Sequence, residues 1–323
     1  MVVLERQNLE FHFPQLHEAA KGLVSFQRTL RIPDDNREYP LPPGLGKFPL
    51  FHLEDYADRV PEVWKTRGGV FFPMYQSEAM WLDFLSLYPC AIKVAAGKIN
   101  AVTGKPWENT LSDSPQDYMV MSEQPWLDGF CVGEGLIRQF VAMPLGEGFT
   151  AEEQITGKAE FGGLQICVYP MKKEFYADLK EREYVENIMD EPQFCRERPH
   201  ESALGMGLAP GGLMSQEIYE DEYGLEAWDV DAMSRCYIHL VNSEQFCKVT
   251  GYAPPDPPPT AKTYTDAGLP WFEYYDSDKK ALAGAKPLAQ IDSVAARMIK
   301  MGRKTFPGND YVIPKQRIVL GPN

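Results

Sequence analysis

Leu136-Ile-Arg-Gln-Phe-Val-Ala-Met143 is the stretch that decides the fold class. It is apolar at both ends with one polar Arg-Gln step between them, a pattern typical of a strand that is buried over most of one face. Similar short runs, rich in Val, Ile, Tyr and Phe and bounded by Gly, Pro or Asn, recur along the chain. They lie at residues 23–32, 70–73, 90–95, 118–121, 164–169, 237–241 and 311–319.

Helical patterns are fewer. Met80, Phe84 and Leu87 follow one another at i, i+4 and i+7, which predicts a helix over residues 76–87. Residues 174–188 and 288–301 predict two more, the second after Pro287 in a helix-start position. Strands and helices do not alternate regularly. We therefore expect a mainly β (α+β) protein, an antiparallel β-sandwich or barrel-like core with a few peripheral helices.

The composition excludes several classes of partner. The 323 residues carry a net charge of −14, which repels phosphate backbones and anionic lipid headgroups. No run approaches the roughly 18 apolar residues of a spanning helix, so we expect no nucleic-acid binding and no membrane insertion. No zinc spacing, phosphate loop, dinucleotide fingerprint or serine nucleophile elbow occurs, so we expect no metal and no cofactor, and the catalytic residues stay unknown. The expected location is cytoplasmic.

A proline-rich break divides the chain. Residues 251–259 read Gly-Tyr-Ala-Pro-Pro-Asp-Pro-Pro-Pro, which favours an extended connection between a β-rich core at 1–250 and a C-terminal part at 251–323. Four aromatic residues follow, and they must dock on some surface: Trp271, Phe272, Tyr274 and Tyr275. Two interpretations stay open: an arm folded back over its own domain, or an arm that reaches a neighbouring subunit, where aromatic anchors are favoured.

The chemically densest stretch is residues 116–171. Arg138, Glu152, Glu153 and Gln154 lie there on or between apolar strand runs and are candidates for the lining of a pocket. Thr150 stands three residues before Glu153, in capping-box order, so the same residues are equally explained as the start of a helix.

Six cysteines are scattered through the chain, and four lie inside apolar, strand-like runs. Buried free thiols that behave as small hydrophobic side chains are one interpretation. An intermolecular disulfide or a reactive thiol is the other, and Cys195 and Cys247 are the candidates for the disulfide.

Several long strings resemble a known family. They include Arg138-Gln-Phe-Val-Ala-Met-Pro-Leu-Gly-Glu-Gly-Phe-Thr-Ala-Glu-Glu-Gln-Ile-Thr-Gly157 and residues 44–50, 73–76, 93–104 and 267–272. The family is uncharacterised and spread over actinobacteria, other bacteria and some lower eukaryotes. Many members are called "integral membrane protein", a description that the absence of any apolar span makes unsuitable here. The chain is also similar to a crystal-forming protein of fungal vacuoles, which implies ordered self-assembly, cysteine cross-links between subunits and a vacuolar location as an alternative.

Two functional hypotheses are consistent with these features. The first is a soluble, non-enzymatic protein that self-associates into an ordered homo-oligomer or a higher-order assembly, with itself as partner. The second is an enzyme or binding protein for a small polar ligand, held in a pocket that the 116–171 region lines.

Overall fold

This computed structural model describes residues 1–183, 205–274 and 279–320 of the chain. Strands make up 37% of the protein and helices 18%, so the mainly β class is confirmed and the helix content is below the common one third. In the described part, no helix is long and apolar enough to cross a bilayer.

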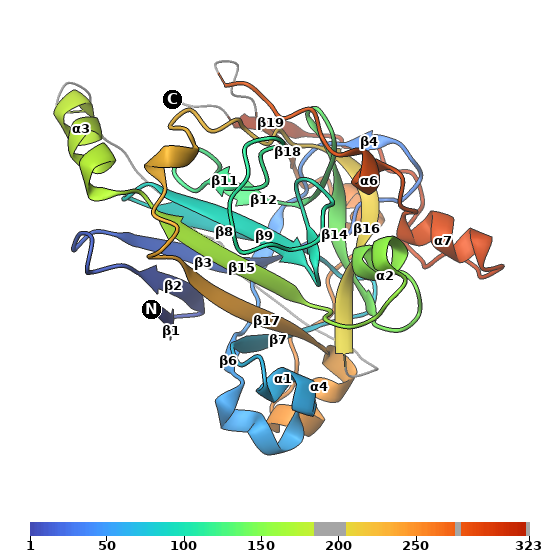
Figure 1. The fold of residues 1–323 in the computed structure, drawn as a ribbon. Helices are drawn as coiled ribbons and strands as arrows, with labels where there is room; N and C mark the ends of the chain where they lie inside the picture. The colour runs from blue at the N-terminus through green and yellow to red at the C-terminus, as the bar shows by residue number, and fades with distance from the viewer. Residues whose placement is uncertain (184–204, 275–278, 321–323) are drawn as a thin grey trace.

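Nine strands form the body of one large sheet, and every neighbouring pair along it is antiparallel (Figure 1). In their spatial order they are β1 (Val2–Glu5), β2 (Asn8–His12), β3 (Lys21–Thr29), β8 (Ala79–Ser86), β14 (Leu136–Pro144), β16 (Gly205–Ser215), β17 (Ser234–Asn242), β15 (Leu164–Pro170) and β9 (Cys90–Ala96).

Shorter strands add further pairings to this sheet. β7 (Val70–Met74) and β4 (Glu38–Tyr39) add the only parallel pairings, to β17 and β16, among the described strands of this sheet. The others are β5 (Gly44–Lys47), β6 (Phe51–His52), β10 (Ile99–Asn100), β11 (Met119–Val120), β12 (Trp126–Leu127) and β13 (Gly129–Gly133).

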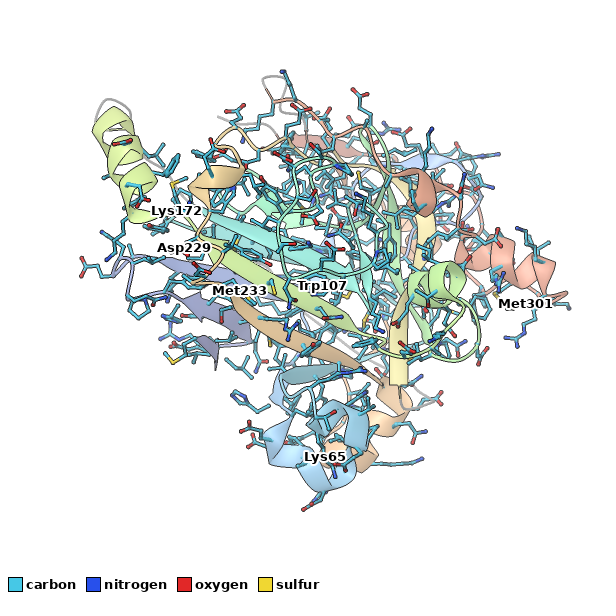
Figure 2. The ribbon with its side chains drawn as sticks, in the orientation of Figure 1. Lys65, Trp107, Lys172, Asp229, Met233 and Met301 are labelled. Carbon is cyan, nitrogen blue, oxygen red and sulfur yellow. The ribbon has the colours of Figure 1, made fainter. Side chains whose placement is uncertain are left out.

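The helices are short and lie around the sheet (Figure 1). They are η1 (Glu54–Arg59), α1 (Glu62–Lys65), α2 (Ala151–Thr156), α3 (Lys173–Glu183), η2 (Leu225–Ala227), α4 (Ser243–Thr250), α5 (Ala261–Asp266), α6 (Lys286–Ala289) and α7 (Val294–Lys300). Met301, at the end of α7, lies at the periphery of the molecule, whereas Trp107 lies over the sheet and packs against the core (Figure 2).

The main core lies where β3 and β8 face β7, β9 and β15. The rings of Phe26 on β3 and Phe72 on β7 are 5.1 Å apart, and Phe48 stacks on Phe72 at 4.7 Å. Gly22 on β3 permits a close approach, because a Cβ there would lie 3.0 Å from the Met121 sulfur. The sheet thus bends over a continuous apolar interior.

A buried ion pair ties the core to the proline-rich segment. Arg28 on β3 donates to Glu78 at the start of β8, and both side chains are almost fully buried. A second Arg28 nitrogen donates to the Asp256 carbonyl oxygen at 2.7 Å, and the Tyr75 hydroxyl donates to the Pro255 carbonyl oxygen at 3.0 Å. The proline-rich connection therefore lies against its own domain.

The predicted helix at residues 76–87 is wrong, because this segment forms strand β8. Met80 and Phe84 fit a helical stripe and a period-two strand equally well, and the alternation decides between them. Met80, Leu82 and Phe84 are buried, while Trp81 and Asp83 are half-buried. Leu87, which the helix would have placed in the core, is 84% exposed.

Other predicted bounds are corrected more mildly. The helix expected over residues 288–301 is two helices, α6 and α7, because the Ser293 hydroxyl accepts from the Ala296 amide and starts α7 afresh. The strand expected over 311–319 is limited to β19 (Arg317–Leu320). The helix expected over 174–188 corresponds to α3, and its last residues lie outside the described part of the chain.

Substitution of Phe84 tests the strand assignment. Phe84→Ala should lower the free energy of unfolding by about 3–5 kcal/mol, because it empties a buried ring position. Leu87→Ala is the matched control and should change that free energy by less than about 0.5 kcal/mol. Urea unfolding of the two variants measures both values, and equal losses would contradict the observed orientation of β8.

Candidate functional site

The C-terminal part of the chain forms a small sheet of its own. β18 (Trp271–Tyr274) and β19 pair in parallel, with Trp271 opposite Arg317 and Tyr274 opposite Leu320. On its other edge β18 exchanges two backbone hydrogen bonds with Leu41, of 2.8 and 2.9 Å. This sheet is therefore attached to the body through β18, and β19 is its outer strand.

The aromatic segment points into its own domain. Trp271 is completely buried beside Tyr39, Ala261 and Val312, and its indole nitrogen donates to the Thr265 hydroxyl at 3.1 Å. Phe272 and Tyr274 are half-buried, and the Tyr274 ring meets Trp126 edge-on at 4.8 Å. Tyr275, the fourth candidate interface residue, lies outside the described residues. Trp271 has no surface left for another subunit.

β19 has the opposite character, because its apolar side chains face solvent. Ile318, Val319 and Leu320 are 44%, 68% and 44% exposed. Tyr311 and Ile313, which precede the strand, are also exposed. No backbone partner lies along the outer edge of β19 among the described residues. This exposed apolar edge strand is the surface that we define as the β19 edge.

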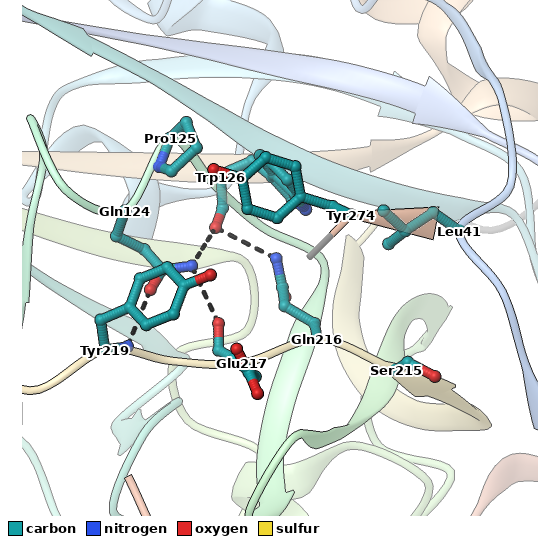
Figure 3. Close-up of a pocket in the computed structure, with 9 residues that line it drawn as sticks. All are labelled: Leu41, Gln124, Pro125, Trp126, Ser215, Gln216, Glu217, Tyr219 and Tyr274. Carbon is teal, nitrogen blue, oxygen red and sulfur yellow. Dashed lines mark hydrogen bonds between the residues drawn. The ribbon is translucent and has the colours of Figure 1, made fainter. Parts of the chain in front are cut away.

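Three glutamines hold the segment after β16 against the β11–β12 region, and Figure 3 shows two of them, Gln124 and Gln216. Gln124 donates to the Glu217 carbonyl oxygen at 3.2 Å and accepts from the Tyr219 amide at 3.0 Å. Gln116 donates to the Tyr219 carbonyl oxygen and accepts from the Asp221 amide. Gln216 lies on the opposite segment, where it donates to the Trp126 carbonyl oxygen and accepts from the Asp128 amide. These side chains replace a backbone ladder between the two segments.

The hollow beside this glutamine ladder is too small for a ligand. It is lined by Gln124, Trp126, Gln216 and Tyr274 and has a volume of about 20 Å³ (Figure 3). A cavity needs about 10–15 Å³ to hold one water molecule, so this hollow accommodates little more than one.

Asp128 is a buried acid next to the ladder. One of its carboxylate oxygens is buried without a hydrogen-bond partner among the described residues. Burial raises the pKa of Asp128 to about 7, an effect that a contact from Trp126 only partly offsets. The neutral form is therefore favoured inside the fold below about pH 7.

A much larger cleft opens on the other side of the ladder. It lies between residues 102–118, 220–225 and 282–287 and has a volume of about 730 Å³. Asp221 is fixed at its wall, because one carboxylate oxygen accepts from the Tyr118 hydroxyl at 2.6 Å and from the Trp228 indole at 2.8 Å. Val102, Tyr118 and Leu282 supply apolar surface to the cleft. In the described part of the chain, no group of three or more His, Cys, Asp or Glu side chains is placed to hold a metal ion.

The candidate pocket residues do not line this cleft. Glu153 completes the predicted capping box with Thr150 and also accepts from the Gly146 and Gly148 amides. Glu152 accepts from the amides of Phe161 and Gly162. The capping interpretation of Thr150 and Glu153 is therefore confirmed.

The remaining two pocket candidates are also bound to their own chain. Gln154 donates to the Asp292 carbonyl oxygen at 2.9 Å and accepts from the Asp292 amide at 2.8 Å. Arg138 donates to the Gly211 carbonyl oxygen at 3.1 Å and lies 3.8 Å from an Asp34 oxygen. Gln154 thus holds the segment before α7, and Arg138 holds the neighbouring strand β16. The sequence pattern could not distinguish such polar clamps from the lining of a pocket.

A scan of protein-family models, a search of curated proteins and a search of solved structures gave no significant match to this chain. The resemblance drawn from the sequence stays a prediction. The function of the protein is therefore inferred from the chain's own residues and their contacts.

The cysteines divide by exposure. Cys90, Cys131, Cys167 and Cys236 lie in strands and are buried, as the interpretation of strand cysteines as small hydrophobic side chains requires. Burial raises the pKa of the Cys167 thiol to about 11 and of the other three to about 12. Cys247 on α4 is exposed, and Cys195 lies outside the described residues.

Asp128 makes stability depend on pH. An unfolded Asp ionises near pH 4, whereas the folded carboxyl keeps its proton to about pH 7. The contribution of this group to stability is thus greatest in acid and falls by roughly 4 kcal/mol as the pH rises through that window. Asp128→Asn removes the titration. Urea unfolding measures the free energy of unfolding of the variant minus that of the unchanged chain. This difference should be larger at about pH 8 than at about pH 5.

The exposed Asp58→Asn is the control for this measurement and should follow the unchanged chain at both pH values. If Asp128→Asn also keeps the same difference in stability at both pH values, the carboxyl does not titrate in this window.

Thiol labelling tests the cysteine assignment. In the native protein, Cys247 should react with iodoacetamide much faster than the four buried strand cysteines, because a reactive thiol must be accessible and form its thiolate. Mass spectrometry of tryptic peptides gives each rate. Unfolding in urea should equalise the rates, and rapid native labelling of Cys167 would contradict its placement in the core.

Proposed function

We propose that this protein is a non-enzymatic structural protein whose copies pair through the β19 edge to form an ordered homo-oligomer. The observation that carries the proposal is the exposed apolar edge strand, Ile318-Val319-Leu320, in a two-stranded parallel sheet. Parallel sheets are normally covered on both faces, and two-stranded ribbons are marginal in water. A strand from a second copy would supply the missing backbone partners.

Few charged side chains lie along this edge. Residues 1–278 contain 23 basic and 44 acidic residues, so most of the protein repels another copy. Residues 279–323 contain nine basic and two acidic residues. Residues 311–320 carry only Lys315 and Arg317 as charged side chains, so two copies approach there with few like charges between them.

An antiparallel pairing satisfies the geometry of two identical strands. A twofold axis between Ile318 and Val319 places Ile318 of one copy opposite Val319 of the other, and Arg317 opposite Leu320. The two arginines do not face each other. Each Arg317 also keeps its own carboxylate partner, Glu273, at 2.5 Å.

A four-residue pairing is small for a stable interface, which usually buries at least about 1,200 Å² in total. Tyr311 and Ile313 lie directly before β19 and are 53% and 65% exposed, so they enlarge the apolar surface. Cys247 is exposed on α4 and is available for an intermolecular disulfide, with Cys195 as the proposed second thiol. The disulfide would reinforce an assembly that packing already holds.

Val319→Lys tests the β19 edge. A lysine on an edge strand opposes pairing with another strand, so this variant should sediment as a monomer at a protein concentration at which the unchanged chain is a dimer or larger. Val230→Lys is the matched control, because Val230 is a valine that is 47% exposed and lies outside any strand. It should keep the mass of the unchanged chain.

Sedimentation with and without reductant separates the two contributions. Retention of the oligomer under reductant is expected, because strand pairing does not need a disulfide. A monomeric intact chain at about 10–100 µM, or a Val319→Lys variant with an unchanged mass, would overturn the proposal.

A further inference from the structure

The large cleft carries charges that form no ion pair within the described part of the chain. Lys105, Lys286, Asp113 and Glu220 all line it, and none of them makes an ion pair with another described residue. Elsewhere the described surface contains many such pairs, for example Lys98 with Glu160 at 2.6 Å. These four exposed side chains therefore place charges of both signs around one concave surface.

These charges are separated by sign. At one end, Asp221 accepts a hydrogen bond from the Tyr118 hydroxyl. The pKa of Tyr118 is raised chiefly by burial, next by Asp221 and to a smaller extent by Asp113. Asp113 also forms an isolated β-bridge with Gln116, whose side chain accepts from the Asp221 amide, so the two carboxylates lie on segments that touch. Glu220 is the neighbour of Asp221, so three carboxylates share this acidic end.

The basic end is formed where two loops touch. A Cβ on Gly104 would lie 2.9 Å from the Pro287 side chain and 3.0 Å from that of Leu288. Lys105 and Lys286, which flank this contact, thus belong to one end of the cleft. The segment before Lys286 forms one wall, because the Glu220 amide donates to the Lys280 carbonyl oxygen and the Leu282 amide to that of Ile218.

This wall also limits the distance between the two ends. The backbone of Lys280 is hydrogen-bonded to Glu220 at the acidic end, and Lys286 is six residues further on. The wall between the two ends therefore spans at most about 20 Å. An extended peptide advances about 3.3 Å per residue, so a peptide of up to about six residues fits within this span. The volume of about 730 Å³ lies in the usual range for ligand sites.

We propose that the cleft binds a short peptide as a dipolar ligand, with its ammonium group at Asp113 and Glu220 and its carboxylate at Lys105 and Lys286. The apolar surface of Val102, Tyr118 and Leu282 packs against the peptide between its two charged ends. The glutamine ladder preorganises the acidic end, since Gln116 holds the Asp221 amide at 2.8 Å before any ligand arrives.

Isothermal titration calorimetry with trialanine and trileucine tests the site. At least one of these peptides should bind, and N-acetylation or C-amidation should each weaken its binding about fivefold by removing one charged contact. Lys286→Gln should weaken the free peptide by a similar factor but leave the amidated peptide unchanged. Asp113→Asn should likewise weaken binding of the free peptide but leave binding of the acetylated peptide unchanged.

Lys280→Gln is the matched control, because the Lys280 side chain is exposed and is not one of the residues that line the cleft. It should bind the free peptide as the unchanged chain does, and so should Val319→Lys. The proposal is overturned if neither tripeptide binds at about 1 mM, if blocked and free peptides bind equally, or if Lys280→Gln weakens binding as much as Lys286→Gln.

Discussion

The buried ion pair between Arg28 and Glu78 is the contact on which the arrangement of the sheet depends. Glu78 lies at the turn into β8, and its second carboxylate oxygen accepts from the Tyr75 amide at 2.8 Å. Its backbone carbonyl accepts from Ala142 on β14. Strands β3, β8 and β14 and the proline-rich connection thus meet at one charged pair. Removal of either partner would leave a buried charge uncompensated, at a cost of about 3–5 kcal/mol.

Arg28 and Glu78 also bond to backbone groups, and other polar side chains do the same where regular strand pairing ends. Gln116, Gln124 and Gln216 join two segments that have no continuous ladder between them. Gln154 does the same between α2 and the chain before α7. Each amide side chain offers one acceptor and two donors, so it satisfies an amide and a carbonyl group of the same stretch. Irregular segments can therefore be held in place without water.

The C-terminal part combines attachment with exposure. Trp271 anchors it by complete burial, and Arg303 on this basic segment reaches Glu147 on the acidic body at 2.7 Å. Attachment through β18 leaves β19 as the outer strand. The proposed assembly surface and the proposed peptide cleft use different parts of this segment, residues 311–320 and 282–287. Self-association and ligand binding can therefore be tested independently.

The sequence by itself determined the mainly β class and most of the long strands, and it offered the Thr150–Glu153 cap and the burial of the strand cysteines each as one of two interpretations. These features depend on local pattern, such as the short apolar runs of β14 or the three-residue spacing of a capping box. The sequence did not determine whether residues 76–87 form a helix or a strand, because Met80 and Phe84 satisfy both periods. Only pairing with β3 and β14 selects the strand. The tertiary structure alone decided that Trp271 is buried in its own domain, that Gln116 and Gln124 bond to the segment after β16, and that Asp113 and Lys286 line one cleft. Those outcomes depend on contacts between residues about a hundred or more positions apart, which no local pattern encodes.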